Sequence, residues 1–351
     1  MSKNDISARK KNHLDICLDD KAEIESSDLY LFPQIKFIHQ ALPELNGDDI
    51  NMKVDFHKHT IDLPLFISCM TGGSSEGFKS NKNLAQSAEI SRIPVGMGSF
   101  RILLEKPELF HHFELKKYAP SVPVIGNIGM VQLRDDSQKD ILKISSDLGI
   151  DLLAVHINPG QELFQQNGDR NFLNLRNVLA DFIQKSPIPV IVKETGCGFT
   201  PSLVTFFKEI GALYIDVSGG GGTNWISVEG ENSLEKEVAE LFRQWGIPTA
   251  VSLYLSGKKA PLLASGGIKT GLDAVKSIAL GAKAAGMARP FIRAVNEGGV
   301  EGAVSLINDI KKVFQTVMVL TGSKDIKELQ NVPLVFDSDF ISLCNQYGEK
   351  S

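Results

Sequence analysis

Residues 264–290 read ASGGIKTGLDAVKSIALGAKAAGMARP and contain the pattern from which the fold can be predicted. A short apolar run ends in two glycines and leads into residues 271–282, where apolar positions recur every three or four residues, as on one face of a helix. A second short apolar run follows at once. This order predicts a strand, a helix and a second, parallel strand, the repeating unit of α/β folds.

The same pattern extends over the chain from residue 61 onward. Short runs that are nearly continuous in apolar residues alternate with longer amphipathic stretches such as residues 202–212. There are eight such runs, at residues 63–73, 93–99, 122–129, 152–158, 190–196, 214–222, 261–268 and 282–290. Runs of this kind are typical of parallel strands buried on both faces, and eight strand–helix units predict a (β/α)8, or TIM, barrel. No GxGxxG motif opens a helix after the first run, which counts against an open dinucleotide-binding sheet.

The first 60 residues are more polar and differ from the rest of the chain. We therefore predict an N-terminal extension over residues 1–60, a barrel over residues 61–335 and a C-terminal tail over residues 336–351. The basic segment that begins at Ser7 is compatible with a short helix or with a mobile arm.

Composition excludes several classes of protein. The chain has 351 residues and a net charge of −5, which argues against a general nucleic-acid binder. No apolar run approaches the ~18–20 residues that a membrane span requires, and no apolar segment follows the basic N-terminus as in a secretory signal. The four cysteines lie far apart without a CxxC pair, so neither a disulfide framework nor a zinc ribbon is expected. A cytoplasmic protein is predicted.

Polar residues gather where the predicted strands end, which is where the active site of such a barrel lies. The glycines of the seventh loop and the end of the eighth strand predict a phosphate cradle, although the same glycines would suit a plain tight turn. Four consecutive glycines after the sixth strand, between Ser218 and Thr223, suit contact with a phosphate or ribityl chain, a flexible lid, or both.

Three further strand-end features predict chemistry. Lys193 ends an apolar strand and needs an anion or a polar ligand, because a buried, unpaired ammonium is costly. His156 and Asn158 share one face of the fourth strand end, where we expect them to bind substrate. Glu162 is a hard oxygen donor that would suit Mg²⁺, although a solvated carboxylate at a helix start explains it equally well.

Taken together, these motifs resemble those of the type 2 isopentenyl-diphosphate isomerases, which are flavin-dependent enzymes. The resemblance covers nearly the whole chain and rests on an ordered set of motifs. They are Arg9-Lys10 with His13, Met70-Thr71-Gly72-Gly73, Gly98-Ser99-x-Arg101, Asn127, His156-x-Asn158-x-x-Gln161-Glu162, Lys193-Glu194, Asp216-Val-Ser218 with Gly-Gly-Thr223-Asn-Trp225, and Ala264-Ser-Gly-Gly-Ile268.

The resemblance implies an isomerase that interconverts isopentenyl diphosphate and dimethylallyl diphosphate with reduced FMN and Mg²⁺. It implies that Arg9, Lys10 and His13 bind the substrate diphosphate and that Ser99 and Arg101 lie near flavin and diphosphate. It implies that Gln161 is the catalytic residue beside the alkene and that Glu162 holds the metal. The implied flavin-binding residues are Cys69, Met70, Thr71, Ser99, Asn127, Lys193, Ser218, Thr223, Gly267, Ile268, Lys269, Ala288 and Arg289.

FMN is expected rather than FAD, because the sequence shows one phosphate cradle. NADPH is expected to reduce the flavin, and a homo-oligomer, a tetramer or octamer, is expected. Two positions depart from the resemblance: Phe100 stands where the family usually has Gln, and Lys269 stands where it usually has Arg.

Two alternatives stay open. An FMN-dependent oxidoreductase of the 2-hydroxyacid oxidase type would need a His base after strand six or seven, and neither loop contains one. One of the inosinate dehydrogenase type would need a nucleophilic Cys, for which Cys197 is the only candidate. A non-enzymatic binding barrel would leave the polar strand ends unexplained.

Overall fold

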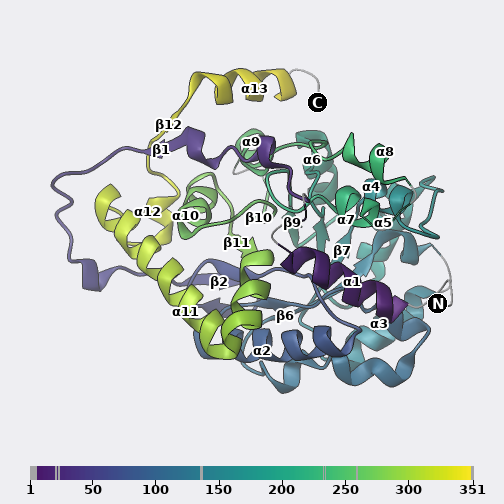
Figure 1. Cartoon of the computed structure of the whole chain (residues 1–351). Coiled ribbons are helices and arrows are strands. Elements are labelled where there is room, and N and C mark those ends of the chain that lie inside the picture. The colour runs from purple at the N-terminus through teal and green to yellow at the C-terminus, as the bar shows by residue number, and fades with distance from the viewer. Residues whose placement is uncertain are drawn as a thin grey trace.

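The protein is a closed barrel of eight parallel strands, seen in a computed structural model that describes residues 6–19, 22, 24–134, 137–231, 233, 235–257 and 260–348 (Figure 1). The barrel strands are β4 (Leu65–Ile67), β5 (Val95–Gly96), β6 (Val124–Gly129), β7 (Leu152–His156), β8 (Val190–Lys193), β9 (Tyr214–Asp216), β10 (Leu262–Ala264) and β11 (Ala284–Met287). They neighbour one another in chain order, and β11 closes the barrel against β4. Each strand lies within one of the eight apolar runs, so the predicted (β/α)8 barrel is confirmed.

Helices surround the strands, as the amphipathic stretches predict. They are α2 (Ser75–Ser91), α3 (Ser137–Asp147), α4 (Pro159–Phe164), α5 (Leu175–Lys185), α6 (Pro201–Glu209), α7 (Trp225–Gly230), α8 (Lys236–Glu240), α9 (Thr249–Ser256), α10 (Gly271–Ala279), α11 (Arg289–Thr321) and α12 (Ile326–Leu329). A capping box between Thr270 and Asp273 starts α10. The second unit differs, because three 3-10 helices over residues 100–104, 107–112 and 115–117 connect β5 to β6.

A hairpin closes the amino-terminal end of the barrel. Strands β2 (Val54–Phe56) and β3 (His59–Ile61) pair antiparallel, and Phe56 stacks on Tyr214 of β9 with ring centroids 4.9 Å apart. The backbone N–H of His57 donates to the Tyr214 hydroxyl at 2.9 Å. Because the hairpin covers this end, a ligand can reach the barrel interior from the opposite end, at the carboxyl ends of the strands.

Both ends of the chain pack on the barrel. Helix α1 (Ile6–Leu18) lies across the barrel in Figure 1, so the basic segment forms a helix. Strand β1 (Ile35–Phe37) pairs antiparallel with β12 (Leu334–Phe336), and α13 (Ser338–Gly348) follows and packs on α9.

The proposed three-part division stays a prediction. Its boundaries at residues 60 and 335 fall within β3 and β12, and residues 1–5 and 349–351 lie outside the described residues. Among the helices described, none combines the length and apolar character that crossing a membrane requires.

Candidate active site

A cavity of about 610 Å³ opens at the carboxyl ends of the strands. The loops after all eight barrel strands line it, together with α1 and Glu25. Of the residues predicted from sequence, it brings together Arg9, Lys10, His13, Cys69, Met70, Thr71, Ser99, Arg101, Asn127, His156, Gln161, Glu162, Lys193, Ser218, Thr223, Gly267, Ile268, Lys269, Ala288 and Arg289. Asn158 is the one predicted residue that does not line it.

The glycine-rich loop after β9 packs backbone against backbone on the loop after β10. A Cβ on Gly222 would lie 2.5 Å from the backbone nitrogen of Gly267, and one on Gly266 would lie 2.3 Å from the carbonyl oxygen of Gly219. Gly266 and Gly267 also have φ angles of +83° and +70°, which side chains disfavour. These glycines therefore allow a close approach between two loops, which argues against a freely moving lid.

The anion that pairs with Lys193 is a carboxylate of the protein itself, that of Asp216. Nζ of Lys193 lies 2.8 Å from Oδ2 of Asp216 and donates to Oγ of Ser265 at 2.8 Å. Glu194 points away and accepts N–H groups of the loop at residues 195–198. The ammonium is thus buried, paired and held at the cavity wall. Sequence reasoning missed Asp216 and Ser265 as its partners, although an aspartate inside an apolar strand is a signal.

Three cations from α1 and the loop after β5, Arg9, Lys10 and Arg101, line the cavity close to one another. Nζ of Lys10 donates to the carbonyl oxygen of Ser99 at 2.5 Å. Burial, followed by the charges of Arg9 and Arg101, lowers the pKa of Lys10 to about 7. Within the part of the chain that the structure describes, Nε of Arg9 is buried without a hydrogen-bond partner. This cluster is suited to an anionic ligand with several oxygens, such as a diphosphate.

Glu229 of α7 lies near these cations and is one of the carboxylates whose charge acts on Arg9. It accepts a hydrogen bond from Nε2 of Gln161 at 3.0 Å, and its other oxygen lies 3.3 Å from Nε2 of His13. Burial acts to raise the pKa of Glu229, but His13, Gln161 and Arg9 outweigh it and leave this pKa lowered. Sequence reasoning missed Glu229, whose signal is a carboxylate on a short helix with many buried residues.

His156 and Asn158 have different surroundings, although both follow β7. Nδ1 of His156 lies 2.9 Å from Oδ1 of Asn127, and burial, then Lys193 and Lys10, lower the pKa of His156 to about 4. Its imidazole is neutral at pH 7. Asn158 caps α4 by accepting the backbone N–H of Gln161 at 2.7 Å, and its amide donates to Thr195.

Glu162 lines the cavity beside the cation cluster. It accepts the backbone N–H of Asp169 at 2.9 Å, and burial raises its pKa while Arg101 counteracts that effect. Among the described residues no group of three or more His, Cys, Asp or Glu side chains surrounds a metal position. A single carboxylate fits Mg²⁺ where substrate phosphates and water supply the other ligands.

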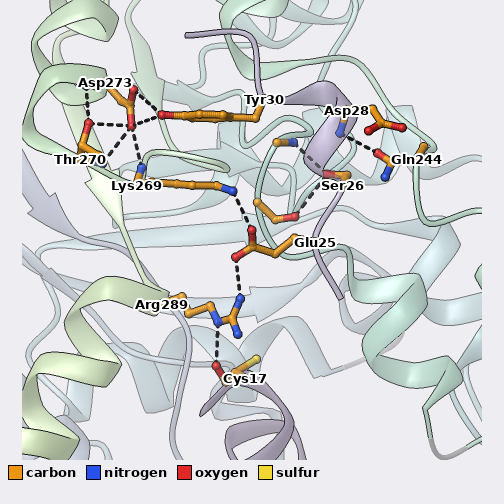
Figure 2. Close-up of polar contacts among 12 residues, drawn as sticks. Cys17, Glu25, Ser26, Asp28, Tyr30, Gln244, Lys269, Thr270, Asp273 and Arg289 are labelled. Carbon is orange, nitrogen blue, oxygen red and sulfur yellow. Dashed lines mark hydrogen bonds and ion pairs between the residues drawn. The ribbon is translucent and has the colours of Figure 1, made fainter. Parts of the chain in front are cut away.

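The expected phosphate cradle contains a carboxylate that the sequence did not indicate. Glu25 bridges Lys269 and Arg289, at 2.6 Å and 2.5 Å, as Figure 2 shows. The ring of Tyr30 lies 4.7 Å from Nζ of Lys269, and its hydroxyl donates to Asp273 at 2.9 Å. Backbone amides of both loops and the first turn of the long helix α11 suit a phosphate here. The cradle therefore fits the phosphate of FMN.

Comparisons with known proteins agree with this geometry. A family profile of FMN-dependent dehydrogenases matches residues 147–335. The isopentenyl-diphosphate delta-isomerase of Borreliella afzelii (strain PKo) is 40% identical over 328 residues, which cover 93% of this chain and 92% of that protein. The enzyme of that name from Pyrococcus furiosus is 36% identical over 341 residues, covering 93% of this chain and 86% of that protein.

Solved structures with a similar fold include a mandelate oxidase mutant with benzaldehyde and a flavocytochrome b2 mutant with benzoylformate. The first has a TM-score of 0.65 at 16% identity and covers 94% of both chains. The second has a TM-score of 0.67 at 17% identity and covers 93% of this chain and 81% of that one. At this level of identity the likeness concerns the fold alone.

Proposed function

The chain belongs to the type 2, FMN-dependent isopentenyl-diphosphate delta-isomerases, and we propose how its residues divide the work of that reaction. Isomerisation of isopentenyl to dimethylallyl diphosphate adds a proton at one carbon and removes one from another, without net redox change. The observation that carries the assignment is the cation cluster of Arg9, Lys10 and Arg101 at the cavity, in which Nε of Arg9 has no hydrogen-bond partner among the described residues and the Lys10 ammonium donates to a backbone carbonyl.

The cation cluster would hold the substrate diphosphate, with Mg²⁺ between it and Glu162. Fixing the diphosphate uses binding energy remote from the reacting carbons to position the alkene. His13, Ser99 and His156 would complete this end of the site. Asn158 is also proposed to serve substrate binding, and its cap on α4 supports a positioning role through Gln161.

Gln161 is proposed to lie beside the alkene as the catalytic residue. Its Nε2 donates one of its two N–H groups to Glu229, so that the second N–H group can donate, and the carbonyl oxygen can accept, a hydrogen bond in the cavity. When bound, reduced FMN supplies an electron-rich ring and an acid–base group at N5 for the proton transfers.

The residues proposed to hold FMN come from most of the strand ends. Lys193 would face the N1–C2 carbonyl edge of the ring, while the phosphate would lie at residues 267–269 and 288–289. The remaining proposed contacts are those of Cys69, Met70, Thr71, Ser99, Asn127, Ser218 and Thr223.

Further parts of the proposal concern the surroundings of the reaction. NADPH is proposed as the reductant of the flavin, and the cytoplasm as the location. A homo-oligomer, tetramer or octamer, would cover the exposed apolar side chains of Val238, Leu241 and Trp245 in and after α8, which are 48%, 82% and 61% exposed.

The alternative, net oxidoreductase chemistry, is less supported. Burial and Glu194 raise the pKa of the Cys197 thiol, and this thiol does not line the cavity. Both features disfavour a thiolate nucleophile.

The test is the isomerase rate of the FMN-loaded, reduced protein against Mg²⁺ concentration. We expect Glu162→Gln to need more Mg²⁺ and to recover part of its activity at high Mg²⁺, because a charged oxygen ligand is lost. We expect Gln161→Ala to lower turnover with little change in the Mg²⁺ requirement. Identical Mg²⁺ curves for wild type and Glu162→Gln would refute the metal role, and full activity of Gln161→Ala would remove Gln161 from the chemistry.

A second readout separates the two reaction classes. The isomerase should form product without consuming NADPH stoichiometrically, since no redox change results. Hydrogen peroxide release with a 2-hydroxyacid, in the absence of isomerase activity, would favour the oxidoreductase.

A further inference from the structure

Glu25 brings a negative charge to the subsite where the cofactor phosphate is expected. Its two carboxylate oxygens are divided between two cations, Oε2 toward Nζ of Lys269 and Oε1 toward Nη1 of Arg289 (Figure 2). Lys269 comes from the loop after β10 and Arg289 from the start of α11, and all three side chains line the cavity.

The charge state of Glu25 is settled by its partners. Burial acts to raise its pKa, but the hydrogen bond and charge of Lys269, then those of Arg289, outweigh burial and leave the pKa of Glu25 lowered. Glu25 is therefore an anion at neutral pH. A phosphate monoester that reached the same cations would be a second anion at close range, and the two would repel.

The backbone around Glu25 is fixed on the barrel. Residue 25 forms an antiparallel bridge with Thr223, and Ser26 donates its backbone N–H to the carbonyl of Gly222 at 2.9 Å. The hydroxyl of Ser26 also accepts the N–H of Gly221 at 2.8 Å. Because the backbone is held on the glycine-rich loop, Glu25 can give up its partners by rotation of its side chain, which is 32% exposed.

Arg289 is held toward the N-terminal segment by further contacts. Its Nε donates to the carbonyl of Cys17 at 2.8 Å, and Nη2 donates to the carbonyl of Asp19 at 3.2 Å. The first of these carbonyls belongs to the last turn of α1, where a cation is favourable. Arg289 is thus positioned by the chain that carries Glu25 when no phosphate competes for it.

We propose that Glu25 is an internal ligand of the cofactor-phosphate subsite, which the phosphate of the flavin must displace from Lys269 and Arg289. The proposal rests on the proposed use of FMN at this cradle. It assigns Glu25 a role opposite to that of an ordinary binding residue, because its charge weakens the binding of the phosphate and leaves the binding of the flavin ring unchanged.

The test compares two flavins that differ only in the phosphate. FMN and riboflavin are titrated into the full-length chain freed of bound flavin, and binding is followed by quenching of flavin fluorescence. For Glu25→Gln we expect FMN to bind roughly tenfold more tightly, which is the effect of removing one nearby like charge at a partly exposed site, and riboflavin to bind unchanged.

Two further variants control the result. Glu240→Gln removes an exposed carboxylate that pairs with Arg243 at 2.9 Å. This variant should bind FMN and riboflavin with the affinities of wild type. Glu25→Asp keeps the charge but shortens the side chain, so it should bind FMN more nearly as wild type does.

Weaker FMN binding by Glu25→Gln, or equal changes for FMN and riboflavin, would overturn the proposal and leave Glu25 as an anchor of the N-terminal segment. If FMN binds wild type no better than riboflavin does, or neither flavin binds, the proposed cofactor site fails instead. If Glu25→Gln does not fold, Glu25→Ala removes the same charge and is titrated in its place, with tighter FMN binding and unchanged riboflavin binding expected and unchanged FMN binding contradicting the proposal.

Discussion

Two clusters, each made of oppositely charged side chains, lie at the same cavity, and they differ in how far they are exposed to solvent. Lys193 and Asp216 belong to barrel strands, and their side chains are only 7% and 2% exposed. Glu25, Lys269 and Arg289 join the N-terminal segment to barrel loops, with side chains 32%, 34% and 14% exposed. In the first cluster, loss of one partner leaves a buried, uncompensated charge, whereas in the second, water or another anion can replace the partner. We therefore expect the first cluster to hold its side chains in place, whereas in the second cluster Glu25 can be replaced by another anion.

The largest effect is expected from breaking the buried cluster. Asp216→Asn leaves the Lys193 ammonium with Ser265 as its remaining partner, and we expect a loss of about 3–5 kcal/mol in the free energy of unfolding. Urea unfolding measures this loss. The control is Asp337→Asn, which removes the exposed partner of Lys36 at 3.0 Å and should leave the urea midpoint unchanged. If Asp216→Asn lowered the free energy of unfolding no more than the control does, the expected difference between the two clusters would be contradicted.

A double variant sharpens the same contrast. Lys193→Met combined with Asp216→Leu removes both charges together, and apolar replacement of a buried pair is often neutral for stability. We expect unfolding stability close to wild type but low isomerase activity, because the proposed contact with the flavin is lost. Full activity of this double variant would show that Lys193 serves stability alone.

An intermediate effect is expected at Lys10, a half-buried cation that donates to the carbonyl oxygen of Ser99. With a pKa of about 7, its protonated fraction falls as the pH rises from 6 to 8. Affinity for sulfate, an anion whose own charge does not change over this range, should therefore fall roughly tenfold, equivalent to about 1.4 kcal/mol. Calorimetric titration of the flavin-free protein measures it.

Lys10→Met keeps the other titrating groups of the cavity and so isolates the contribution of Lys10. The variant should bind sulfate more weakly at pH 6 and lose most of the pH dependence. The same slope in both proteins would assign the titration to another group.

The smallest effect is expected from Glu25→Gln on stability. The cluster is partly exposed, so we expect a loss of about 1 kcal/mol or less in the free energy of unfolding. Added KCl should reduce even this loss by screening, while the loss caused by Asp216→Asn should persist. Urea unfolding at low and high salt measures both. If Glu25→Gln lowered the free energy of unfolding as much as Asp216→Asn does, and equally at low and high salt, the two clusters would not differ in the way described.

The barrel and most of the cavity wall could be predicted because both follow from local sequence. An apolar run predicts a buried strand, and the polar residue that ends it must lie at the carboxyl end, where the loops converge. Lys193, Gln161 and Glu162 were located at the cavity in this way. Asn158 was located only in part, because its position three residues before Gln161 also suits a helix cap.

The pairs that set the charges could not be predicted, since their members lie far apart in the chain. Glu25 lies 244 residues from Lys269, and Gln161 lies 68 residues from Glu229. In the sequence these carboxylates look like surface residues, and only the closed barrel brings them to their partners, Lys269 for Glu25 and the Gln161 amide for Glu229. Asp216 stands out in the sequence as a charged residue within the apolar run at 214–222, but the sequence does not indicate that Lys193 lies beside it.

The pairing of β1 with β12 has a consequence for synthesis of the protein on the ribosome. Phe37 emerges 297 residues before its partner Leu334, a wait of about 15 to 60 s at ordinary rates of translation. Throughout that time residues 35–37 lack the strand with which they pair in the folded protein, and an unpaired segment of this kind can pair with other nascent chains. Its middle residue is Lys36, an exposed cation that later pairs with Asp337. A charge at the centre of so short a strand discourages wrong partners until the last part of the chain arrives.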